Sequence, residues 1–153
     1  MNRTLRVSAI VLLGVLTSAS APTTGYERAT ATQITVFKDP NCGCCKSWVE
    51  HLRKHGFAVA VRDTSDVSGA KRSGHVPQQL HSCHTAFVNG YVIEGHVPAA
   101  DIQRLLTEKP KVAGLAVPGM PVGSPGMEMG ARADSYEVVA FNRDGATRVF
   151  ARH

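Results

Sequence analysis

The most constraining feature of the sequence is a group of three cysteines within four consecutive positions, Cys42-Gly43-Cys44-Cys45. The residues before it, Gln33 to Lys38, have the β-branched and aromatic composition of a buried strand. The residues after it, from Trp48 to Leu52, have the apolar spacing of a helix that ends near Gly56. This order predicts that the sulfurs lie at the first turn of a helix, where free backbone amides and the helix dipole stabilise thiolates.

The rest of the chain predicts a single domain of mixed α/β class, with the element order β-α-β-α-β-β-α. The Asn89-Gly90 pair predicts a hairpin, because this dipeptide readily adopts the positive φ angles of a type I′ turn. The further expected elements are a strand over Phe57 to Val61, a short helix over Asp66 to Ser73 capped by Asp66, hairpin strands over Thr85 to Val88 and Tyr91 to Glu94, and a helix over Pro98 to Leu106 that Pro110 ends.

This order resembles the thioredoxin and glutaredoxin fold, in which a redox motif lies between the first strand and the first helix. Cys42 to Cys45 hold that place here, and Phe87 to Gly90 resembles the glutaredoxin hairpin. That fold has a cis-proline before its third strand, facing the motif, and the matching position here is His84. The resemblance therefore implies that Cys83 and His84 lie beside the cysteine group.

The C-terminal third departs from the periodic pattern. Leu115 to Gly130 contains four glycines, three prolines and three methionines, which predicts an appended loop and excludes a helix or a long strand. Tyr136 to Phe141 and Ala146 to Ala151, joined by a turn at Asn142 to Gly145, predict a terminal β-hairpin. We assign one thioredoxin-like metal-binding domain to residues 33–152.

The N-terminus has the pattern of a secretory signal. A short basic start precedes an apolar run from Val7 to Leu16 and small residues up to Ala21, so we expect a signal peptide over residues 1–21, cleaved after Ala19 or Ala21. The run is about half the roughly 20 residues that cross a bilayer, so no stable membrane insertion is expected after cleavage. A polar spacer occupies residues 22–32. These features predict a periplasmic location.

The third thiol of the group, Cys44, favours metal binding. Thiol exchange needs only two cysteines, whereas a third neighbouring thiol invites scrambled disulfides in an oxidising compartment. Thiolates and thioethers select soft ions, and the loop methionines Met120, Met127 and Met129 favour copper among them. Two alternatives remain open: the cysteines form structural disulfides, with Cys83 pairing Cys44, or the methionines only fill gaps in an irregular core.

Two of the seven histidines are candidates for the same site: His84, which adjoins Cys83, and His96, which follows the hairpin. His51 and His55 are spaced i, i+4 on the first helix, and we expect them to face water. The net charge of +5 comes from scattered basic residues without interleaved aromatics, which argues against a nucleic-acid partner. Hydrolase, nucleotide-binding and zinc-protease motifs are absent from the sequence.

Three segments taken together resemble the CopG-type copper-resistance family over roughly Gln33 to Phe150. The segments are DPNCGCCKSWVEHL (39–52), LHSCHTAFVNGYVIEGHVPAADIQRLL (80–106) and GLAVPGMPVGSPGME (114–128). The resemblance implies a periplasmic, thioredoxin-like protein of a bacterial copper-handling system, with other copper-handling proteins as partners. It also implies that four cysteines bind Cu(I): Cys42, Cys44, Cys45 and Cys83.

The sequence leaves three functions open. The first is a periplasmic copper-binding protein that holds Cu(I) through these cysteines, with Cu(I)/Cu(II) redox activity as an addition. The second is a thiol-disulfide oxidoreductase in which Cys42 attacks and Cys45 resolves. The third is a structural zinc or disulfide site in a plain binding module.

Overall fold

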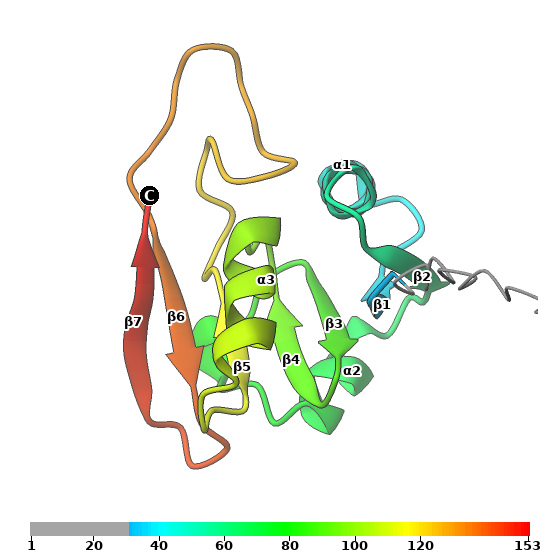
Figure 1. The fold of residues 1–153 in the computed structure, drawn as a ribbon. Helices are drawn as coiled ribbons and strands as arrows, with labels where there is room; N and C mark the ends of the chain where they lie inside the picture. The colour runs from blue at the N-terminus through cyan, green and yellow to red at the C-terminus, as the bar shows by residue number, and fades with distance from the viewer. Residues whose placement is uncertain (1–30) are drawn as a thin grey trace, which may run out of the picture.

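A seven-stranded mixed sheet, with the strand order β2-β1-β3-β4-β5-β6-β7, organises the protein. The computed structural model describes residues 31–153 (Figure 1). The expected signal peptide and nearly all of the polar spacer lie outside the described residues. In this part of the chain no helix is long and apolar enough to cross a bilayer.

The cysteine group lies where the sequence places it, between a central strand and a helix. Strand β1, Gln33–Lys38, pairs in parallel with β2, Ala58–Asp63, and antiparallel with β3, His84–Val88. Helix α1, Gly43–Lys54, begins inside the cysteine group. It ends at Lys54 and is followed by the C-cap His55 and by Gly56, which has a φ of +87°.

The hairpin and the short helix are confirmed. Strand β3 turns into β4, Tyr91–Glu94, through Asn89 and Gly90, whose φ angles of +45° and +85° are those of a type I′ turn. Helix α2, Val67–Ser73, is capped by the Asp66 side chain, which accepts from the Gly69 amide. A 3-10 turn that the sequence did not indicate, η1, follows at Gln78–Leu80.

The C-terminal part differs from expectation in three places. Helix α3, Ala99–Glu108, runs two residues past Leu106, and its C-cap Lys109 adopts a left-handed conformation directly before Pro110. Strand β5, Gly114–Ala116, occupies the start of the segment expected to be a loop, so the loop begins at Val117. Strands β6, Glu137–Phe141, and β7, Thr147–Arg152, form the expected hairpin but continue the central sheet through β5.

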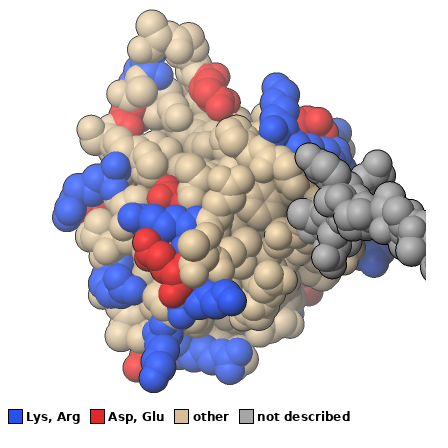
Figure 2. Space-filling view, in the orientation of Figure 1, with Lys and Arg blue, Asp and Glu red and all other residues tan. Residues whose placement is uncertain are grey.

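Apolar side chains cover both faces of the sheet. Helices α1 and α3 pack on one face, where Trp48, Leu52 and Ile102 are completely buried (Figure 1). A smaller cluster on the other face includes Val76 and Leu80, from the segment after α2, and Phe141 of β6. Lysine and arginine side chains lie separately around one face of the molecule, several of them beside acidic ones (Figure 2). The mixed α/β class is confirmed, and its thioredoxin-like detail stays a prediction.

Candidate metal centre

Three of the four cysteines lie at the N-terminal end of helix α1. Cys42 is the N-cap residue, and its Sγ accepts from the Cys45 amide at 3.3 Å. A disulfide joins Cys42 to Cys45, with 5.3 Å between their Cα atoms, while Cys44 and Cys83 are free thiols. The alternative of structural disulfides therefore applies to Cys42 and Cys45, but Cys44 does not pair with Cys83.

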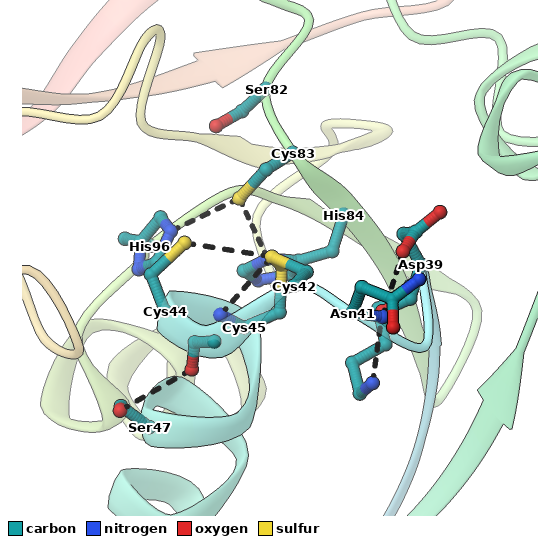
Figure 3. The surroundings of a disulfide bond; sticks show 12 residues. Asp39, Asn41, Cys42, Cys44, Cys45, Ser47, Ser82, Cys83, His84 and His96 are labelled. Carbon is teal, nitrogen blue, oxygen red and sulfur yellow. Dashed lines mark hydrogen bonds between the residues drawn. A yellow bond between two sulfur atoms is a disulfide. The ribbon is translucent and has the colours of Figure 1, made fainter.

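The fourth cysteine reaches this group from a distant part of the chain. Cys83 lies directly before β3, which pairs with β1, the strand that leads into the cysteine group. Cys44 Sγ lies 3.5 Å from Cys42 Sγ, and all four sulfurs lie within 4.8 Å of one another (Figure 3). The structure thus brings together the four cysteines that the sequence nominated.

Two buried histidines complete a second donor set around Cys83. The Cys83 Sγ lies 3.2 Å from His84 Nδ1 and 3.1 Å from His96 Nε2. The Nδ1 of His96 lies 2.7 Å from the Pro125 carbonyl, which can only accept, so Nδ1 carries the proton and Nε2 offers its lone pair to the centre. The Nε2 of His84 is buried and has no partner among the described residues.

Burial controls the protonation of this second set. Loss of solvation, together with the neighbouring Cys44, raises the pKa of the Cys83 thiol to about 12. Burial lowers the pKa of His96 and lowers the pKa of His84 well below its usual value, to which the neighbouring His96 and Lys71 also contribute. At neutral pH this second donor set therefore offers one protonated thiol and two neutral imidazoles. Neutral imidazole is the form that binds metals, and the thiol must lose its proton to do so.

The methionine-containing loop, Val117 to Gly130, contacts the N-terminal turn of α1. Gly126, with a φ of +85°, packs so closely that a Cβ atom there would lie 2.7 Å from the Cys44 carbonyl oxygen. Met127 follows it and is partly buried, whereas Met120 and Met129 are 52% and 65% exposed. Met127 is therefore the methionine next to the residue that contacts α1, and the other two thioethers face solvent.

The remaining histidines take other roles. His51 does not simply face water as expected, because its Nε2 accepts the Ala99 amide at the start of α3 and its side chain is partly buried. Burial lowers the pKa of His51, consistent with a neutral acceptor. His55 is exposed, and His153 bonds to Asp101 at 2.7 Å. None of these three belongs to a metal-competent group within residues 31–153.

The motifs and the fold both have counterparts among known proteins. A family described as "Protein of unknown function, DUF411" matches residues 80–127. A solved structure titled "Copper resistance protein copG- Form 2" is 49% identical and covers 80% of this chain and 98% of its own, with a TM-score of 0.77. The chain belongs to the CopG-type copper-resistance family. A second structure, "Copper resistance protein copG- Form 1", is 50% identical over the same shares, with a TM-score of 0.76. No curated protein matches this CopG-type chain.

Sequence reasoning missed two features of the candidate site. One is the Pro125 carbonyl that fixes the tautomer of His96. The other is the buried ion pair of Lys71 and Glu94, which lies behind Cys83. Neither has a local signal, since a backbone carbonyl carries no side-chain identity and a charged residue in a strand pattern ordinarily indicates a solvent-facing position.

Proposed function

We propose that this protein is a periplasmic copper-binding protein of copper resistance or homeostasis that holds Cu(I) through Cys42, Cys44, Cys45 and Cys83. The observation that carries the proposal is the convergence of four sulfurs, from the start of α1 and the start of β3, within 4.8 Å of one another. Four soft donors at this spacing suit a soft monovalent ion, and bridging thiolates allow more than one ion to share the cluster.

The donors around the sulfurs favour copper over zinc. His96 offers Nε2 beside Cys83, and His84 lies against the same sulfur from the other side. Met127, Met120 and Met129 add thioethers, which zinc sites do not use. We assign His84, His96 and Met127 as supplementary ligands. The exposed Met120 and Met129 are assigned as donors that bind copper at the surface of the loop.

The disulfide makes copper binding depend on the redox state. The full set of four thiolates exists only after Cys42 and Cys45 take up two electrons, which breaks the bond between their sulfurs and leaves two thiolates. In the reverse direction, the reduced pair supplies two electrons, so two Cu(II) ions become two Cu(I) ions while the disulfide forms. This balance supports a Cu(I)/Cu(II) redox activity at the same cluster.

An anaerobic Cu(I) titration of the fully reduced protein against a competing chelator tests the proposal, with Zn(II) run in parallel. We expect tight Cu(I) binding that outcompetes zinc and protects all four thiols from alkylation. Replacing Cys42 and Cys45 by serine should remove it, whereas His55→Gln, a change at an exposed histidine at the end of α1, should not. Unchanged affinity in the double serine variant would contradict the assignment.

The disulfide also favours a second candidate, a thiol-disulfide oxidoreductase. Cys42 caps α1, and its disulfide with Cys45 has the C-x-x-C spacing that such enzymes use. This function requires metal-free turnover of a model disulfide that Cys42→Ser abolishes. Turnover at the background rate, together with tight Cu(I) binding, would exclude it.

A further inference from the structure

The ion pair beside the candidate metal centre is buried. Glu94 on β4 is 0% exposed, and its Oε1 accepts from Lys71 Nζ of α2 at 2.5 Å. Its Oε2 accepts from the Thr85 hydroxyl at 2.7 Å, across the β3–β4 pairing. The last partner is a backbone group: the Ser82 amide donates to Oε1 at 2.6 Å.

Stability alone is a weak explanation for such a pair. Removing two charges from water is costly, and apolar residues of similar volume often replace a buried ion pair without loss of stability. What an apolar pair cannot reproduce is an acceptor aimed at one particular backbone amide. In this chain that amide belongs to the residue directly before Cys83.

Ser82 is fixed on two further sides. Its hydroxyl donates to the Gly119 carbonyl of the methionine-containing loop at 2.6 Å. A Cβ atom on Gly95 would lie 2.6 Å from the Ser82 Oγ, so the Ser82 side chain packs closely against the Gly95 backbone. Cys83 then points from this fixed residue toward the other sulfurs and His96 (Figure 3). The backbone at Ser82 therefore controls where the fourth sulfur lies.

We propose that Glu94 is a positioning residue for Cys83: its carboxylate holds the Ser82 amide, and so presents the Cys83 sulfur to the cysteines of α1. Lys71 Nζ donates to the same carboxylate and orients it within the core. The inference rests on the proposed function, because it concerns the fourth thiolate of the Cu(I) cluster. It adds the requirement that a buried hydrogen-bond acceptor outside the cluster holds this thiolate in position.

Two double variants separate the charge from the acceptor. Lys71→Met with Glu94→Gln removes both charges but keeps an amide oxygen for the Ser82 amide, whereas Lys71→Met with Glu94→Leu removes the acceptor as well. We expect Cu(I) affinity within about threefold of the parent for the first and about 10- to 100-fold weaker for the second, the range for lost outer-shell partners. In the Cu(I)-loaded second variant, only Cys83 should become open to alkylation.

A second pair of variants leaves the ion pair intact, in case the buried substitutions prevent folding. Ser82→Pro removes the amide proton, and the preceding His81, with a ψ of 137°, already has a conformation that tolerates a following proline. Ser82→Ala keeps the amide and sets the baseline for loss of the hydroxyl. We expect Cys83 to lose its protection in the proline variant and to keep it in the alanine variant.

The outcomes distinguish this inference from the proposed function. If Cu(I) fails to protect Cys83 in the parent protein, the proposed function fails. If Cys83 is protected in the parent and equally protected in both Glu94→Leu and Ser82→Pro backgrounds, the positioning role is refuted while the copper site stands. Cys83→Ser provides the reference affinity for a cluster that has lost this thiolate.

Discussion

Gly126 is the residue through which the methionine-containing loop (Val117 to Gly130) contacts helix α1, and we expect Gly126→Ala to separate the two. The added Cβ would lie 2.7 Å from the Cys44 carbonyl oxygen and 2.8 Å from the Trp48 amide nitrogen. Both atoms are backbone atoms inside a helix, so neither can rotate away. The loop must therefore move, and the bond between His96 and the Pro125 carbonyl should break with it.

The structure sets the size of this effect. A residue with a Cβ at a φ of +85° costs about 1–2 kcal/mol of stability, and loss of the His96 bond adds about 0.5–1.5 kcal/mol. Gly145 is a matched control, because its φ is +88° and nothing lies within 4 Å of the Cβ position. We therefore expect Gly145→Ala to cost about 1–2 kcal/mol and Gly126→Ala about 1.5–3.5 kcal/mol.

Urea denaturation of both variants and the parent, all fully reduced and free of metal, measures these free energies of unfolding. A chelator competition on the same samples measures Cu(I) affinity, which should fall in Gly126→Ala and not in Gly145→Ala, since only the former frees His96. The reasoning is refuted if the two variants lose the same stability and the same affinity, because the contact with α1 would then contribute nothing.

Three further predictions follow from single contacts. Denatured protein isolated without reductant should show two reactive thiols and reduced protein four, as counted with a thiol reagent, because Cys42 and Cys45 are paired. The pKa of His51 is lowered in the fold, so its contribution to stability is present above about pH 6.5 and is lost as the pH falls toward its folded pKa. His51→Gln should make the decline in unfolding free energy below that pH shallower, in urea titrations from pH 7.5 to 5. Trp48→Phe should lose about 1–3 kcal/mol in the same assay, because the buried Val97 carbonyl, to which the indole donates at 2.9 Å, is left without its partner.

The elements that the sequence predicted correctly are those fixed by neighbours along the chain. Asn89-Gly90 selects its turn through two local φ angles, and Asp66 caps α2 through an amide three residues away. The start of α1 in the cysteine group follows from the apolar stripe and from Cys42 acting as the cap. Such signals need no knowledge of the tertiary structure.

The elements that it missed depend on partners distant in sequence. Leu115 and Ala116 form a strand only because β4 and β6 pair with them on either side, and three residues carry too little pattern to predict that. Gly114 approaches Val92 so closely that a Cβ there would collide with the Val92 carbonyl, a contact that no local rule indicates. His51 was expected in water because the amide it accepts belongs to α3.

The candidate metal centre shows the same division between local signals and contacts distant in sequence. The spacing of Cys42, Cys44 and Cys45 is local, so their shared helix turn could be predicted from residues alone, whereas the place of Cys83 came from a resemblance. His96 becomes a usable donor only when a carbonyl 29 positions later fixes its tautomer. Docking of the loop and orientation of this donor are therefore one structural event, so a perturbation of the loop should weaken metal binding even where it alters no ligand.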